Sequence, residues 1–151
     1  MRSASRSVLN TTFHSDASRL PSGPGAYILL IEIQTNVTVR LPRRPDAVLV
    51  PGRYLYCGSA GGPGGIKARV ARHMRAAKTV RWHVDQVTTT GKVFGAWVFP
   101  GGLECELVAA LSALPVPIPG FGSSDCRRCT SHLLAWPDGQ RMSFESLLST
   151  K

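Results

Sequence analysis

Two tyrosines stand two residues apart in the stretch YLYCGSA, residues 54–60, just before the chain enters a glycine-rich turn. The alternation of side chains along a strand puts Tyr54 and Tyr56 on one face and Leu55 and Cys57 on the other. A phenol can donate a hydrogen bond to a substrate or to water, and when ionised it can accept a proton. The pair is therefore a candidate for chemistry at the end of a strand.

A basic helix is predicted at residues 66–78, directly after the turn at 58–65. Its polar side chains divide into two groups on a helical wheel. Arg69 and His73 border the apolar stripe and are costly to bury unless paired, so they suggest a site at the helix edge. The alternative is structural: the aliphatic part of the arginine lies along the apolar surface with its charged end in water, and the histidine is simply hydrogen-bonded. The stripe itself is Ile66, Val70 and Met74, and the side chains predicted to point away are Arg72, Arg75 and Lys78.

A second chemically active position is predicted in the helix at residues 103–114. The wheel places Glu104 within the apolar stripe and Glu106 nearly opposite. A carboxylate in the first turn can interact with the helix dipole, or it can bind a hard divalent cation. The apolar stripe consists of Leu107, Val108, Leu111 and Leu114.

The cysteines offer a third kind of chemistry. Cys126 and Cys129 form a CxxC pair, His132 follows three residues later, and Cys105 lies upstream. These ligand types and spacings suit zinc, whereas reduced cysteines that merely pack together are the alternative. A redox role is less favoured, because the CxxC follows a Pro/Gly-rich loop rather than a strand that enters a helix.

Composition restricts the partners and the compartment. The 151 residues carry 18 Lys plus Arg against 9 Asp plus Glu, a formal charge of +9, which favours polyanions such as nucleic acid over the alternative of a merely basic soluble protein. There is no apolar run of about 18 residues, so no membrane partner is expected. Residues 1–22 are predicted to be a disordered tail, with a transit peptide as the alternative, and reduced thiols in a cytoplasmic protein are expected.

One domain is predicted over residues 23–151, with a C-terminal extension that contains the Cys/His segment. No repeat or linker divides the chain into two cores. A Pro/Gly-rich loop is expected at 115–125. The expected strands are 25–33, 36–41, 52–58, 92–99 and 132–136, and the expected helices are 66–78, 80–89, 103–114 and 144–149.

The order of these motifs resembles the GIY-YIG nuclease superfamily. Gly25-Ala26-Tyr27 is similar to its first strand motif and Tyr56-Cys57-Gly58 to its second. The segment RVARH, with Arg69, Arg72 and His73, is similar to the basic helix that follows, and Glu104 is similar in setting to the metal-binding glutamate. The likeness runs from about residue 23 to 136 and is closest to a branch found alone or fused to endonuclease III-type glycosylases. Ala26, the long turn and the Cys/His segment depart from the pattern.

This resemblance implies an α+β fold, with a small, mainly antiparallel central sheet flanked by helices in α/β/α layers. It also implies a metal-dependent endonuclease that hydrolyses DNA phosphodiesters in repair or processing, with a repair protein as a further partner. In this interpretation Glu104 binds one Mg²⁺ or Mn²⁺, Tyr56 orients or deprotonates water, and Arg69 stabilises charge on the phosphoryl group. The remaining expected residues are Tyr27 and His73 in the catalytic cluster and Tyr54, Ser59, Lys67, Arg72 and Arg75 as nucleic-acid contacts.

Two alternatives belong to other functional classes. A nucleic-acid-binding module that keeps the fold without catalysis needs only positive charge. A zinc-stabilised interaction domain would be built around Cys105, Cys126, Cys129 and His132.

Overall fold

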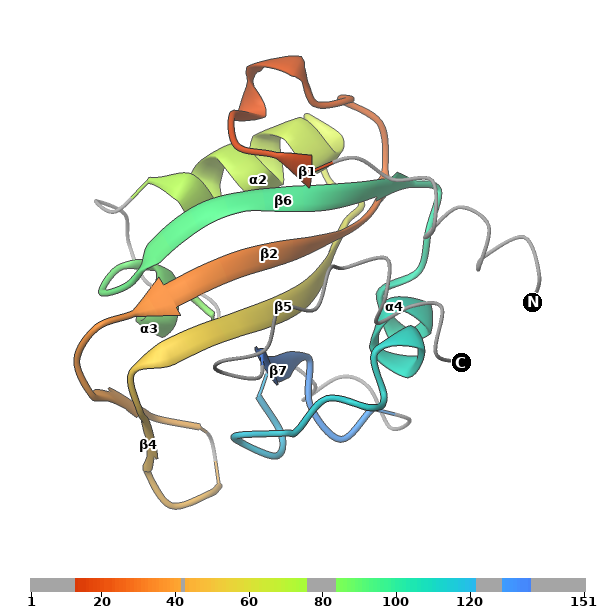
Figure 1. The fold of residues 1–151 in the computed structure, drawn as a ribbon. Coiled ribbons are helices and arrows are strands. Elements are labelled where there is room, and N and C mark those ends of the chain that lie inside the picture. Colours follow the sequence, from red (N-terminus) through yellow and green to blue (C-terminus); the bar gives the residue numbers. More distant parts are fainter. Residues whose placement is uncertain (1–12, 42, 76–83, 122–128, 137–151) are drawn as a thin grey trace.

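An antiparallel sheet of five strands forms the centre of the fold in the computed structural model, which describes residues 13–41, 43–75, 84–121 and 129–136. The strand order is β1-β6-β2-β5-β7, so β2 is central and pairs with β6 on one side and β5 on the other (Figure 1). All pairings are antiparallel, which confirms the predicted α+β class and the mainly antiparallel sheet. The strands are β1 (Phe13–His14), β2 (Gly25–Ile33), β5 (Gly52–Ala60), β6 (Lys92–Pro100) and β7 (Leu133–Trp136).

Helices cover both faces of the sheet because β2 is apolar on both sides. Tyr27 and the side chains at alternate positions after it pack with helix α2 (Gly65–Met74) and with α3 (Asp85–Thr88). Ala26 and Ile28 point the other way and pack with α4 (Glu104–Ala110). The predicted apolar stripes therefore face the sheet: Ile66 and Val70 of α2 are buried in one cluster, and Leu107 and Leu111 are buried in the other. Among the described residues, no helix is long and apolar enough to cross a membrane.

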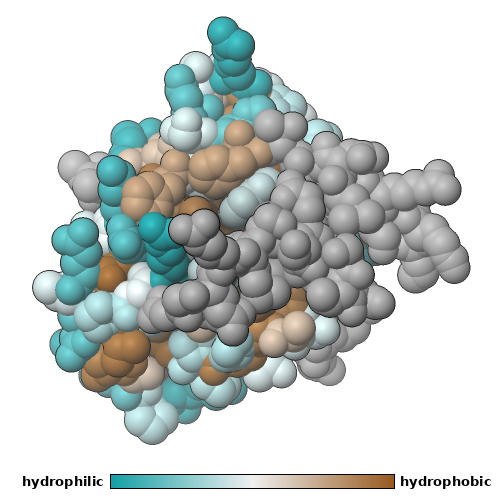
Figure 2. Space-filling view, in the orientation of Figure 1, coloured by the Kyte–Doolittle hydropathy of each residue, from teal (hydrophilic) through white to brown (hydrophobic). Residues whose placement is uncertain are grey.

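A second, two-stranded sheet consists of β3 (Val37–Val39) and β4 (Ala47–Leu49). The strand predicted at 36–41 is thus shorter than expected and pairs outside the main sheet, and the partner strand β4 was not predicted. Three-residue strands leave too little alternation to be recognised in a sequence. The exposed side chains of Val48 and Val50 belong to this end of the molecule, where Figure 2 shows an apolar patch among hydrophilic residues.

The segment before β2 is packed against the domain, so the prediction of a disordered tail over residues 1–22 is wrong for residues 13–22. Phe13 pairs with Trp97 of β6, and their rings lie 4.7 Å apart between centroids. Leu20 is buried in the α2 side of the core. Backbone N–H groups at the start of α2 donate to carbonyls of this segment, Ile66 to Gly23 and Lys67 to Pro21. These contacts are between distant parts of the chain, which local composition does not reveal.

Gly65 permits that close contact. It has a left-handed φ of 59°, and a Cβ atom there would collide with the carbonyl oxygens of Ser22 and Gly23. A side chain would therefore push the first turn of α2 away from residues 21–23. The glycine-rich turn that seemed only to lengthen the loop positions the start of the basic helix.

The helix ends are earlier than predicted. The helix expected at 66–78 ends at Met74, the described part of the helix expected at 80–89 is α3, and the helix expected at 103–114 ends at Ala110. The strands expected at 92–99 and 132–136 are confirmed within one residue at each end. The helix expected at 144–149 and part of the loop at 115–125 lie outside the described residues.

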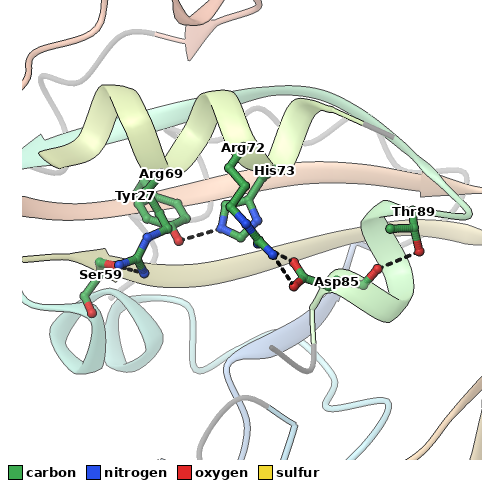
Figure 3. Close-up of polar contacts among 7 residues, drawn as sticks. All are labelled: Tyr27, Ser59, Arg69, Arg72, His73, Asp85 and Thr89. Atoms are coloured by element: carbon green, nitrogen blue, oxygen red, sulfur yellow. Dashed lines mark hydrogen bonds and ion pairs between the residues drawn. The ribbon is translucent and has the colours of Figure 1, made fainter. Parts of the chain in front are cut away.

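A buried ion pair joins α2 to α3. Two guanidinium nitrogens of Arg72 donate to the two carboxylate oxygens of Asp85, at 2.8 and 2.9 Å (Figure 3). The Asp85 side chain is fully buried and that of Arg72 is 15% exposed. The prediction that Arg72 points to solvent and contacts nucleic acid is therefore wrong, because its guanidinium is held by this carboxylate. Bidentate geometry of this kind is the strongest form of an Arg–carboxylate contact.

We expect Arg72→Ala to lower the free energy of unfolding by about 3–5 kcal/mol, because it removes the guanidinium from a buried carboxylate. Denaturant unfolding measures the change. Lys67→Ala, an exposed substitution on the same helix, is the matched control and should change stability by less than about 0.5 kcal/mol. Equal effects of the two substitutions would contradict the role of the pair.

Candidate active site

A buried hydrogen bond between Tyr27 and His73 forms the floor of the candidate site. The Tyr27 hydroxyl lies 2.7 Å from Nε2 of His73, and the rings are 5.5 Å apart between centroids (Figure 3). Each residue is 1% exposed. Tyr27 comes from the central strand and His73 from the last turn of α2, so the bond links the two elements. The prediction that His73 borders the apolar stripe is confirmed, and its ring is among the most buried in the protein.

The glycine of the second strand motif makes room for Tyr27. Gly58 is paired with Tyr27 across β5 and β2. A Cβ atom at position 58 would lie 2.5 Å from Cζ and from the hydroxyl oxygen of Tyr27. Only hydrogen at this position lets the phenol ring lie over β5 and reach His73. The motif Tyr56-Cys57-Gly58 thus shapes the site with its glycine as well as with its tyrosine.

Tyr56 lies on the same face, edge-on to two rings. Its centroid is 6.3 Å from that of His73 and 6.1 Å from that of Phe121, with interplanar angles of 67° and 80°. Phe121 is fully buried. No side chain of the described residues is hydrogen-bonded to the Tyr56 hydroxyl, so this phenol can bind a water molecule or a substrate.

Arg69 lies one turn before His73 on α2. Its Nη1 donates to the carbonyl oxygen of Ser59 at 2.9 Å, at the end of β5 where the glycine-rich turn begins (Figure 3). Its charge and a side-chain hydrogen bond to Tyr27 both lower the pKa of that phenol. Arg69 is half-buried, so it contacts the tyrosine cluster and is also reachable from solvent.

Both phenols of the candidate site are neutral at pH 7. Burial raises the pKa of Tyr27 well above its ordinary value, and the neighbouring Tyr56 raises it further, whereas Arg69 opposes the shift. Burial also raises the pKa of Tyr56, and the negative charge of Glu104 is the second cause. Neutral phenols donate hydrogen bonds, which suits Tyr56 to orienting water. Deprotonation by Tyr56 would need additional positive charge nearby.

Glu104 belongs to α4, on the other face of the sheet, and acts on the tyrosine cluster through its charge. It is the first residue of α4, its side chain is 30% exposed, and one carboxylate oxygen lies 3.5 Å from Nδ1 of His132. β7 pairs with β5 only as far as Tyr56, so the chain just before β7 brings His132 to this edge of the sheet. The charge of Glu104 raises the pKa of Tyr56 from there. Glu106 is exposed, as predicted.

The donor set at Glu104 fits a hard divalent cation. A single, partly exposed carboxylate can bind Mg²⁺ or Mn²⁺ when water and substrate phosphate fill the other coordination positions. The adjacent thiols and imidazole are softer donors and form a separate group.

The predicted nucleic-acid contacts fall into two classes. Ser59, Lys67 and Arg75 are exposed, Ser59 in β5, Lys67 on α2 and Arg75 directly after that helix. Tyr54, in contrast, is 4% exposed and its hydroxyl donates to the carbonyl oxygen of Val50 at 2.6 Å, so the prediction of a substrate contact is wrong. Its hydroxyl is hydrogen-bonded to the residues that connect β4 to β5, so Tyr54 has a structural role at the start of β5.

Three of the four predicted zinc ligands come together. Ligand atoms of Cys105, Cys129 and His132 all lie within 4.8 Å of one another. Cys126 lies outside the described residues.

Sequence reasoning missed two positions that determine this geometry. The partner of Arg72 is Asp85, whose signal in the sequence was the single acidic residue of the segment RWHVDQV. The role of Gly58 was hidden because a glycine in a turn-rich stretch is easily attributed to the turn.

We expect Gly58→Ala to lower the free energy of unfolding by about 1–3 kcal/mol, because the added methyl overlaps the Tyr27 phenol. Chemical denaturation measures this change. Gly61→Ala is the control, since a Cβ atom at position 61 has open space around it and should change stability by less than about 0.5 kcal/mol. A Gly58→Ala protein as stable as Gly61→Ala would show that Tyr27 is not confined as described.

The raised phenol pKa values also predict a pH dependence. Above pH of about 10 the unfolded chain loses its phenolic protons while the folded chain keeps them, so stability is full below that pH and falls as pH rises beyond it. The free energy of unfolding, followed from pH 8 to 11, should fall less steeply in Tyr27→Phe than in the wild type. Identical slopes in the two proteins would contradict the predicted shift.

Comparison with known families finds a match over most of the chain. Residues 26–150 match the family described as Domain of unknown function DUF123, and these residues include every described residue of the site. No curated protein and no solved structure matches the chain. Because the match covers most of its length, the chain belongs to the DUF123 family.

Proposed function

We propose that this DUF123 chain is a metal-dependent endonuclease of the GIY-YIG type, which hydrolyses phosphodiester bonds of DNA in repair or processing. The observation that carries the proposal is the convergence of Tyr27, Tyr56, Arg69 and His73 on one face of the sheet, where the charge of Glu104 raises the pKa of both phenols. These residues come from two strands and two helices. A fold that only bound nucleic acid would need positive charge and would not need two buried phenols beside a carboxylate.

Glu104 would hold the Mg²⁺ or Mn²⁺ ion. When bound, the ion supplies Lewis-acid stabilisation of charge on the phosphate oxygens. The partial exposure of the carboxylate leaves room for a substrate phosphate.

The tyrosines and the arginine have distinct roles. Tyr56 carries the hydroxyl with no hydrogen-bonded side chain among the described residues, so it orients the attacking water. The hydrogen bond between Tyr27 and His73 links β2 to α2 and forms the buried floor of the site. Arg69 lies between this buried pair and solvent, and there its guanidinium stabilises the charge that develops on the phosphoryl group.

DNA is the substrate that the charge distribution favours. The formal charge of +9 attracts a polyanion, and Lys67, Arg75 and Ser59 are exposed next to the site. Burial of Cys57 and the thiol state of Cys105 and Cys129 suit a reducing cytoplasm. A repair protein is a suitable partner for an enzyme that makes single cuts.

A nicking assay on supercoiled plasmid and on branched oligonucleotides, with Mg²⁺ or Mn²⁺, tests the proposal. We expect Glu104→Ala and Tyr56→Phe to abolish metal-dependent cleavage. Arg69→Ala should lower the rate by about 10²–10³-fold while DNA binding stays close to that of the wild type. Glu106→Ala, an exposed glutamate of the same helix, is the matched control and should cleave normally.

Two results would overturn the assignment. If the wild-type protein binds DNA but does not cleave it with either cation, the chain is a non-catalytic binding module. If Glu104→Ala cleaves as well as Glu106→Ala, the carboxylate of Glu104 is not part of the site.

A further inference from the structure

Two thiols and one imidazole from separate segments converge beside α4. Cys105 belongs to the first turn of that helix, whereas Cys129 and His132 lie between the loop region and β7. Their ligand atoms lie within 4.8 Å of one another. In a tetrahedral zinc site, bond lengths of about 2.0–2.3 Å place neighbouring ligand atoms about 3.3–3.8 Å apart. The three side chains therefore need only small movements to bind one ion.

His132 has an unsatisfied environment in the described structure. The residue is 2% exposed, and neither ring nitrogen has a hydrogen-bond partner among the described residues. Its nearest charged group is the Glu104 carboxylate, 3.5 Å from Nδ1, which is longer than a good hydrogen bond. A buried polar group without a partner is destabilising, so this imidazole is arranged for a ligand that the polypeptide does not supply.

The donors select the class of ligand. Thiolate and imidazole together favour zinc and other soft or borderline metals, whereas Mg²⁺ and Ca²⁺ prefer oxygen. Cys105 and Cys129 carry thiols and form no disulfide, so both can act as thiolates after they release their protons to solvent. Glu104 lies 3.5 Å from Nδ1, so a small movement would let its carboxylate accept a hydrogen bond from Nδ1 and orient the imidazole for metal binding through its other nitrogen.

An ion can reach this position from solvent. Cys105 and Cys129 both line a hollow of about 510 Å³ formed by residues of α4 and of the segment 129–134, together with Ser112, Thr130 and Leu134. The two thiols are partly exposed, whereas the imidazole of His132 is buried. The site thus has an entry path and a buried floor, as a metal centre requires.

We propose that this chain binds one zinc ion through Cys105, Cys129 and His132, at a site distinct from that of the cation assigned to Glu104. The ion ties the first turn of α4 to the segment that enters β7. Since Cys105 follows Glu104 directly and His132 contacts its carboxylate, the same ion holds the glutamate against the edge of the sheet. The proposal does not depend on nuclease activity, because metal binding is measured without DNA.

Metal analysis of the full chain, purified under reducing conditions without added metal, tests the proposal. We expect about one zinc ion per chain. After replacement by Co²⁺, the wild-type protein should show thiolate-to-cobalt charge-transfer bands and visible absorption of tetrahedral cobalt. Cys105→Ser and Cys129→Ser should each lower zinc affinity by at least roughly tenfold. Cys57→Ala is the matched control, because it removes a buried cysteine outside the cluster and should keep the zinc.

The absorption spectrum of the cobalt-substituted wild type tests the site even if a serine variant fails to fold. Absence of both retained zinc and cobalt–thiolate bands in the wild type would overturn the proposal. So would wild-type zinc affinity in the folded Cys105→Ser and Cys129→Ser proteins, or a disulfide between these two cysteines after reducing purification. Bound zinc in a chain that does not cleave DNA would support this site and count only against the nuclease.

Discussion

The hydrogen bond between Tyr27 and His73 is the contact on which the candidate site depends. Both groups are buried, so each needs the other, and the bond fixes the distance between β2 and the last turn of α2. Two glycines make this approach possible: Gly58 leaves space for the phenol, and Gly65 lets the helix begin against residues 21–23. With α2 held in this way, Arg69 donates to a carbonyl oxygen at the end of β5, and Arg72 forms its ion pair with Asp85 of α3.

The solvent exposure of the site residues increases from the core to the surface. Tyr27 is 1% exposed, Tyr56 8%, and the side chain of Glu104 30%. The inner residues therefore provide a rigid and neutral floor, since burial keeps the phenols protonated. The outer residues can meet a charged substrate in water. The Cys/His cluster adjoins Glu104, because Cys105 is the next residue of α4 and His132 lies 3.5 Å from the carboxylate. The two proposed metal positions are therefore neighbours at the start of α4.

The sequence predicted the long elements well because their patterns are strong. β2 is a nine-residue strand in which both faces are apolar, and the stripes of α2 and α4 are spaced as helical faces require. The pairing of β1 with β6, the strand β4 and the early end of α2 were not predicted. The β1–β6 pairing depends on contacts between segments distant in sequence, such as Phe13 with Trp97, and no local pattern records such a contact. Strand β4 has only three residues, too few to show an alternation.

The sequence by itself determined which side chains are available: alternation placed Tyr54 and Tyr56 on one face, and helical periodicity separated Glu104 from Glu106 and put Arg69 beside His73. Only the tertiary structure decided which of them face the site. Tyr54 bonds to Val50, Arg72 bonds to Asp85, and Glu104 lies beside His132, although the periodicity of each element permitted other outcomes. The physical reason is that a buried polar group must find a partner, and the identity of that partner is set by which elements the core brings into contact.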